Sequence, residues 1–169
     1  MKSIFVDGYN VINSWAVLSK IKEYSLDAAR EKLIELLQNY GAYKGYRIFI
    51  VFDAHMVQGS LEKREKMGSV IVVFTKEGET ADSFIEKYVN NIGRKFEVCV
   101  VTSDSLEQQI TFQRGATRMS SIEFYHEVME TEEAIKRCAE RKEDNKRYNL
   151  EERLDPKIVE KLEKMRRSK

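Results

Sequence analysis

The sequence lacks any long apolar run. No segment of its 169 residues approaches the ~18 apolar residues of a membrane-spanning helix, so we expect no membrane partner. The first residues enter an apolar stretch without the basic region and cleavage site of a signal peptide, which predicts a cytoplasmic protein. No G-x-G-x-x-G or P-loop motif follows an apolar run, and this argues against a dinucleotide cofactor or a nucleoside triphosphate site.

The chain also has few cysteines, a single proline and almost no net charge. Cys99 and Cys138 lack metal-ligand spacing and are predicted to be reduced, mostly buried thiols. One proline, 42% apolar and 34% charged residues indicate a globular chain long enough for one domain with a real core. The net charge of +1 conceals a weak asymmetry, because residues 131–169 hold 13 Lys and Arg against 10 Asp and Glu. This small excess neither demands nor excludes a nucleic-acid partner.

Apolar runs alternate with segments of helical period. Buried strands are predicted at 4–6, 46–52, 70–74 and 96–101, with a short fifth strand at 114–119. Helices are predicted behind capping residues, at 25–41 with Gly41 as the residue after the helix, from 80 through 89, at 104–112, at 120 to about 141, and from the Asp155-Pro156 pair onward. The alternation predicts a three-layer α/β/α sandwich around a mostly parallel sheet, followed by C-terminal helices. We place a domain at 1–145 and a basic helical extension at 146–169.

Three segments have no clear period. Residues 11–24 are interpreted as a loop with one helical turn at most, in which Tyr9 and Trp15 either pack the sheet edge or stack on a nucleobase. Residues 54–68 are polar and suit a long functional loop or a short exposed helix. Residues 142–154 are polar and are expected to be loosely held.

Aspartate recurs where the predicted strands end. Asp7, Asp53 and Asp104 follow three of the runs, and Asp82 lies in the first turn of the helix after a fourth. Parallel strands bring these ends to one edge of the sheet, where open α/β sheets bind ligands, and Gly8 permits close approach to the backbone there. Two carboxylates ~4 Å apart repel by roughly 4 kcal/mol at an effective dielectric of about 20. The cluster therefore predicts a hard cation, Mg²⁺ or Mn²⁺.

The chemistry expected of such an all-oxygen site is phosphodiester hydrolysis, in which the metal activates a water and stabilises charge on the phosphate. Asn10, Thr102 and Ser103 can bond a metal-bound water or a phosphate oxygen. The candidates for contacts with a phosphate backbone are His55, Lys63, Arg64, Lys66, Arg114 and Arg118. Capping remains the competing interpretation of Asp7 and of residues 102–104, and solvated surface charge that of each basic residue.

The motifs occur in a characteristic order: Phe5-Val6-Asp7-Gly8-Tyr9-Asn10, Phe52-Asp53-Ala54-His55, Val73-Phe74-Thr75 with Glu79-Thr80-Ala81-Asp82, Thr102-Ser103-Asp104 and Arg114-Gly115-Ala116. Over roughly residues 1–130 this set resembles the YacP-like NYN-domain proteins of the PIN-like nuclease group. The resemblance implies a metal-dependent endoribonuclease with Asp7, Asp82 and Asp104 as core acids. The resemblance also leads to the hypothesis that the protein cleaves messenger RNA at the ribosome. It also implies a fourth acid, which is Asp53, Glu79 or Glu86.

Two other functions are compatible with the sequence. A non-catalytic RNA- or ribosome-binding module that keeps the fold would bind RNA whatever the metal and would cut none. A phosphotransfer enzyme with an aspartate nucleophile ranks last, because a haloacid-dehalogenase-type site requires an acid two residues after that nucleophile and Tyr9 stands there.

Overall fold

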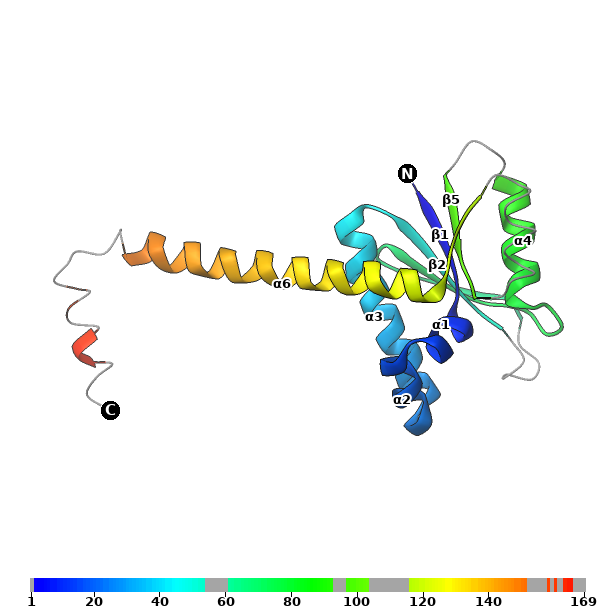
Figure 1. Ribbon diagram of the computed structural model, residues 1–169, viewed down its shortest axis with the longest axis horizontal. Helices are drawn as coiled ribbons and strands as arrows, with labels where there is room; N and C mark the ends of the chain where they lie inside the picture. Colours follow the sequence, from blue (N-terminus) through cyan, green and yellow to red (C-terminus); the bar gives the residue numbers. More distant parts are fainter. Residues whose placement is uncertain are drawn as a thin grey trace. The chain divides into compact units, whose positions relative to one another are not determined.

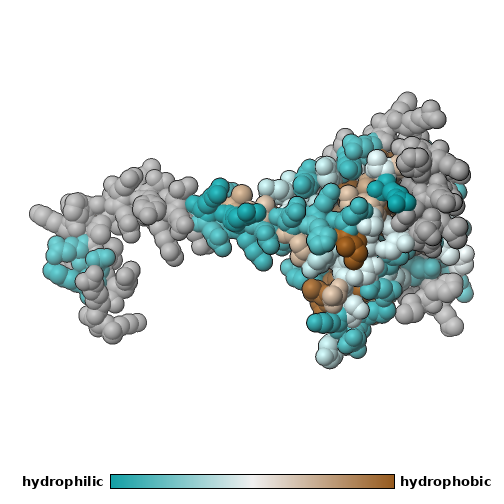
Figure 2. All heavy atoms as spheres, in the orientation of Figure 1, coloured by the Kyte–Doolittle hydropathy of each residue, from teal (hydrophilic) through white to brown (hydrophobic). Residues whose placement is uncertain are grey.

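The computed structural model describes residues 2–53, 61–92, 97–103, 116–151, 158, 160 and 163–165. The chain divides into two compact units, Met1–Glu132 and Glu133–Lys169, and the fold described below is that of the first. The predicted division into 1–145 and 146–169 stays a prediction. Among the described residues, no helix combines the length and the apolar character that crossing a membrane requires. The face seen in Figure 2 is mainly hydrophilic, with small apolar patches.

A six-stranded sheet forms the centre, in the order β3-β4-β2-β1-β5-β6. Five strands are parallel: β1 (Ser3–Asp7), β2 (Arg47–Phe52), β4 (Val70–Phe74), β5 (Val98–Val101) and β6 (Thr117–Met119). Strand β3 (Lys63–Met67) pairs antiparallel with β4 at one edge. The mostly parallel sheet predicted from the apolar runs is confirmed.

Helices cover both faces of this sheet (Figure 1). In β1, β2 and β4, residues of even number, such as Ile4, Ile48 and Val72, pack with α1 (Gly8–Ser14), α2 (Ala16–Tyr24), α3 (Leu26–Lys44) and the start of α6 (Ser121–Glu151). Residues of odd number in the same strands, such as Phe5 and Phe49, pack with α4 (Ala81–Ile92). The period of two along each strand thus divides the core into two apolar layers, and the predicted three-layer sandwich is confirmed.

Three predicted caps are present. The hydroxyls of Ser25 and Thr80 each accept a backbone N–H three residues on, from Ala28 and Ser83, both at 3.2 Å. Ser120 Oγ accepts the N–H of Glu123 at 3.2 Å, and Glu123 Oε2 accepts the N–H of Ser120 at 2.8 Å. These bonds to Ser120 hold the pKa of Glu123 below its usual value. The caps predicted at 104 and 155 lie outside the described residues.

The loop predicted at 11–24 is wrong, because α1 and α2 occupy it. The Asp7 carboxylate, which ends β1, also accepts the Asn10 N–H at 3.0 Å and so starts a helix with no linker. Trp15 separates the two helices and is 1% exposed. Its Nε1 donates to the Ser121 carbonyl at 2.8 Å, so base stacking by Trp15 is excluded and packing is confirmed. Tyr9 is half-buried, with its ring 5.2 Å from that of Phe52.

Residues 63–67 form an edge strand rather than the predicted loop or short helix; residues 54–60 lie outside the described residues. The strand reads Lys-Arg-Glu-Lys-Met and is largely exposed, so it carries no apolar run by which sequence analysis recognises strands. Charged edge strands are common because they resist pairing with other chains. Gly68, at φ 61°, opens the turn into β4.

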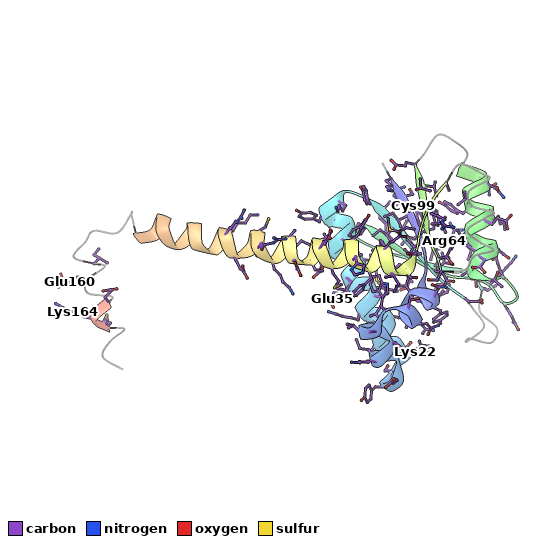
Figure 3. All side chains as sticks on the ribbon, viewed as in Figure 1. Lys22, Glu35, Arg64, Cys99, Glu160 and Lys164 are labelled. Carbon is purple, nitrogen blue, oxygen red and sulfur yellow. The ribbon has the colours of Figure 1, made fainter. Side chains whose placement is uncertain are left out.

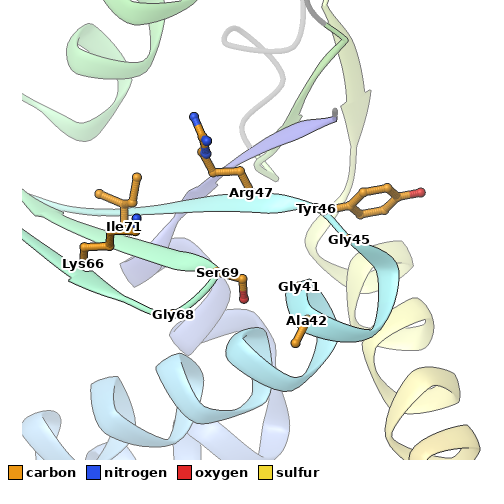
Figure 4. Close-up of a pocket in the computed structure, with 9 residues that line it drawn as sticks. All are labelled: Gly41, Ala42, Gly45, Tyr46, Arg47, Lys66, Gly68, Ser69 and Ile71. Carbon is orange, nitrogen blue, oxygen red and sulfur yellow. The ribbon is translucent and has the colours of Figure 1, made fainter.

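The structure also corrects the predicted ends of two helices and the predicted burial of one cysteine. Helix α3 passes Gly41 and ends at Lys44, followed by Gly45 at φ 70°. Gly41 is buried beside the sheet, where a Cβ would lie 2.7 Å from Ser69 Oγ (Figure 4). Helix α6 continues through Glu151, beyond the end predicted at about residue 141. Both cysteines are free, but Cys138 is exposed whereas Cys99 is buried.

Candidate functional site

A hollow of about 320 Å³ opens at the carboxyl ends of the central strands. It is bounded by the end of β1, the residue after β2, helix α1 and the first turn of α4. Its lining residues are Asp7, Tyr9, Asn10, Asn13, Asp53, Thr80, Ala81 and Asp82. Three of the four aspartates predicted to share one edge therefore line one cavity, and Asp104 lies outside the described residues.

Asp7 is both a helix cap and a member of the acidic cluster. Its Oδ1 accepts the Asn10 N–H, which fixes the carboxylate at the start of α1. Burial is the largest influence and raises the pKa of Asp7, while the charges of Asp82 and Asp53 raise it further. The two interpretations drawn from the sequence are therefore compatible, because one oxygen caps the helix while the group as a whole feels two other acids.

Asp82 and Glu79 hold buried carboxylate oxygens that no donor in the described part of the chain satisfies. These atoms are Asp82 Oδ1 and Glu79 Oε2. The other Glu79 oxygen, Oε1, lies 3.9 Å from Lys87 Nζ, and the Glu79 side chain is only 10% exposed. A buried carboxylate oxygen without a partner is costly, so such atoms favour a cation that completes the site.

The donor set matches what hard divalent cations bind. Carboxylates Asp7, Asp53 and Asp82 supply oxygen ligands only, which suits Mg²⁺ or Mn²⁺ rather than a thiolate- or imidazole-binding metal. Within the described part of the chain, no group of three or more Asp, Glu, His or Cys is close enough to hold a metal by itself. The carboxylates therefore fit an ion that keeps part of its water shell, or one that a further residue also binds.

Asn10 joins three elements at this edge. Its Oδ1 accepts the Ser121 hydroxyl at 2.9 Å and the Ser103 N–H at 3.3 Å. The oxygen is thus used to tie α1 to the start of α6 and to the residues after β5. The amide nitrogen remains as the group that can donate to a ligand oxygen. Thr102, also predicted to contact a phosphate, is buried and its N–H donates to the Met119 carbonyl at 3.2 Å.

The basic candidates lie in several places. Lys63 and Arg64 are exposed on β3, where they pair with Glu65 and Glu62. Arg118 is exposed on β6, and its charge helps to lower the pKa of Glu123. His55 and Arg114 lie outside the described residues.

Sequence reasoning missed Arg30, whose guanidinium lies 5.3 Å from the centre of the Tyr9 ring and also bonds the Tyr9 hydroxyl. The helical spacing of α3 marked only its apolar stripe and gave no signal for this contact.

The family is shown by comparison with known proteins. A family model described as the YacP-like NYN domain matches residues 4–167. The chain belongs to this family. It is 41% identical over 170 residues to YacP of Bacillus subtilis (strain 168), an alignment that covers 99% of this chain and 98% of that protein. The match confirms the resemblance and extends it beyond residue 130. As a YacP-like NYN protein, the chain has a nuclease-like, RNA-related function.

Solved structures of the family share the fold. The crystal structure of Rae1 (YacP) from Bacillus subtilis is 39% identical, with a TM-score of 0.74 over 99% of this chain and 96% of that one. A tryptophan-to-leucine mutant of the same protein gives a TM-score of 0.69 at 39% identity, over 81% of this chain and 80% of that one. At these values the six-stranded sheet and its flanking helices belong to the YacP-like NYN fold.

Proposed function

We propose that this protein is a metal-dependent endoribonuclease that hydrolyses RNA phosphodiester bonds at the hollow lined by Asp7, Asp53 and Asp82. The observation that supports this most is the convergence of three carboxylates from β1, the end of β2 and α4 on one cavity. Asp82 Oδ1 is buried there with no protein donor. Together with a nuclease-like family, this arrangement favours catalysis over simple RNA binding.

Asp7, Asp53 and Asp82 would hold Mg²⁺ or Mn²⁺, with Asp104 as the further ligand expected from the sequence. When bound, the ion supplies positive charge to the phosphodiester in the transition state and acidifies the attacking water. The chain's own residues contribute position. The Asn10 N–H holds the Asp7 carboxylate, and the side chain of Asn10, which lines the hollow, would donate from its amide nitrogen to a phosphate oxygen.

The proposal includes messenger RNA as substrate, in association with the ribosome. The described residues around the hollow are three carboxylates, two amides, Tyr9, Thr80 and Ala81, and they include no arginine or lysine, the residues that most often read base edges. Choice of the cleavage site is therefore assigned to RNA shape or to the ribosome, which presents messenger RNA in a fixed position.

The test is cleavage of a mixed RNA pool, with and without ribosomes, in Mg²⁺, Mn²⁺ or chelator. We expect metal-dependent cleavage by the wild type. Asp82→Asn is expected to lower the rate by roughly 100-fold or more, since even outer partners of metal sites cost about 10–100-fold. Glu23→Gln removes an exposed carboxylate on α2 and serves as the matched control. The contrary result is RNA binding that is unchanged by chelator, with no cleavage in either metal, whether or not ribosomes are present. That result would show a non-catalytic binding module instead.

A further inference from the structure

A second hollow, of about 360 Å³, lies between β3 and α4 and is lined by Glu62, Arg64, Phe84, Lys87, Tyr88 and Asn91. The side chain of Arg64 is labelled in Figure 3. Its guanidinium lies 5.4 Å from the centre of the Phe84 ring and 5.9 Å from that of the Tyr88 ring. Glu62 Oε1 accepts Arg64 Nε at 2.6 Å and lies 2.5 Å from Nη2. The guanidinium is therefore held by Glu62 close to two aromatic rings, and the Arg64 side chain is 50% exposed.

This hollow adjoins the acidic site. Across the sheet, Arg64 is paired with Val73, Val73 with Val51, and Val51 with Asp7. Arg64 and Asp7 therefore stand in one row, three strand spacings or about 14 Å apart. On the helix side, Phe84 follows Asp82 by two residues, and Lys87 Nζ lies 3.9 Å from Glu79 Oε1. A short single strand of RNA can span both hollows.

We propose that the hollow between β3 and α4 binds an unpaired nucleobase of the RNA strand whose phosphodiester lies at Asp7 and Asp82. The inference rests on RNA being the ligand, as in the proposed function. Because Glu62 occupies the Nε and Nη2 edge of Arg64, the surfaces that remain for a ligand are the Nη1 end and the plane of the guanidinium. Guanidinium planes and aromatic rings are the surfaces on which proteins stack unpaired bases. Lys87, at the rim, is placed to contact the adjoining phosphate.

Stacking explains why no base-reading set is needed here. Every base has a π-face, so a stacking platform holds a strand in place with little sequence preference. A duplex cannot use the hollow, because its bases already stack on one another. The site therefore selects single-stranded or locally unpaired RNA next to the scissile bond.

The experiment measures fluorescence anisotropy of labelled octaadenylate and of an octamer with the same backbone but no bases. Every protein carries Asp82→Asn, which is expected to slow cleavage by roughly 100-fold or more during the measurement. The variants are Arg64→Ala and Arg64→Lys, the second of which keeps the charge but lacks the plane. The controls are Arg47→Ala and Arg47→Lys. Arg47 is an exposed arginine at the start of β2, beside a hollow at the amino ends of β2 and β4 (Figure 4).

We expect octaadenylate to bind roughly 10-fold more tightly than the abasic octamer, and both Arg64 variants to lose that preference. The Arg47 variants are expected to keep it. Equal binding of the two octamers, an Arg64→Lys variant that keeps the preference, or no binding of either octamer would overturn the inference. Urea unfolding of each variant checks that the fold is retained.

The outcome is separable from that of the proposed function. If unmodified protein cuts no RNA but its base preference depends on Arg64, the nuclease proposal fails and the stacking site stands. If the unmodified protein cuts RNA but octaadenylate is not preferred over the abasic octamer, the nuclease proposal stands and the stacking site fails.

Discussion

The side-chain oxygen of Asn10 accepts a hydrogen bond from the hydroxyl of Ser121, 111 residues later, at 2.9 Å. Ser121 is buried at the start of α6, and the same Asn10 oxygen also accepts the Ser103 N–H. One amide at the edge of the acidic hollow thus joins α1, α6 and the residues after β5. The backbone N–H of Asn10 donates to the Asp7 carboxylate, so Asn10 also fixes the first acid of the candidate site.

Asn10→Ala should destabilise the fold by about 1–3 kcal/mol, since it leaves the buried Ser121 hydroxyl and the Ser103 N–H without their acceptor. The backbone bond to Asp7 survives in alanine. Ser121→Ala is the matched control and should cost less, about 1 kcal/mol, because the bond to Ser103 remains. Urea unfolding measures both. An Asn10→Ala midpoint equal to that of the wild type would show that this junction does not contribute to stability.

Gly8→Ala should cost about 1–3 kcal/mol through overpacking. A Cβ at position 8 would lie 2.3 Å from Phe52 Cε1, and this ring cannot easily move because it is fully buried beside Tyr9 and Phe74. The buried Phe52 ring therefore requires glycine at position 8, and the close approach of a ligand there stays a prediction. In a Phe52→Leu background the same change should cost clearly less, which a double-mutant cycle in urea measures. Additive costs would rule out this contact.

The parts of the fold that sequence analysis predicted are those with local signals. Apolar runs such as Ile48–Phe52 are long enough to mark buried strands, and the Ser120–Glu123 box marks a helix start by itself. Helix α1 escaped prediction because Asp7 ends a strand and caps a helix at once. Strand β3 was not predicted because an edge strand needs no apolar run. Its pairing with β4 depends on tertiary contacts, which a local sequence pattern does not reveal.

The candidate site was predictable only to the level of shared edges. Strand ends place Asp7 and Asp53 together in any parallel sheet, and the first turn of the next helix adds Asp82. The contact of Asn10 with Ser121 and the row that links Asp7 to Arg64 depend on which strands are neighbours. The strand order is set by packing of the whole core, so residue spacing alone cannot predict it.

Asp7→Asn should make the metal-free protein more stable near neutral pH. Burial raises the pKa of Asp7 above 3.8, so its contribution to stability is complete below that value and is lost as the pH rises through the folded pKa. Asparagine stays neutral and remains a good helix cap. The two proteins should therefore converge in acid and diverge towards about pH 7, in urea unfolding with chelator. A variant less stable than the wild type at neutral pH would contradict the assigned burial cost.

Among the candidates for the fourth acid, the structure favours Asp53. Asp53 lines the hollow with Asp7 and Asp82 and its charge raises the pKa of Asp7, whereas neither Glu79 nor Glu86 is among the described lining residues. Glu79 Oε1 instead lies 3.9 Å from Lys87 Nζ.

A cation that binds only the folded protein stabilises it, by about 2.7 kcal/mol at 100 times its dissociation constant. Mn²⁺ should therefore raise the urea midpoint of the wild type, and Asp53→Asn should remove most of that rise. Glu79→Gln changes a carboxylate to an amide on the Lys87 side of the same edge, and it should keep the Mn²⁺-induced rise. Loss of the rise in Glu79→Gln together with its retention in Asp53→Asn would reverse the assignment and place the ion at the buried, unpartnered oxygens of Glu79 and Asp82.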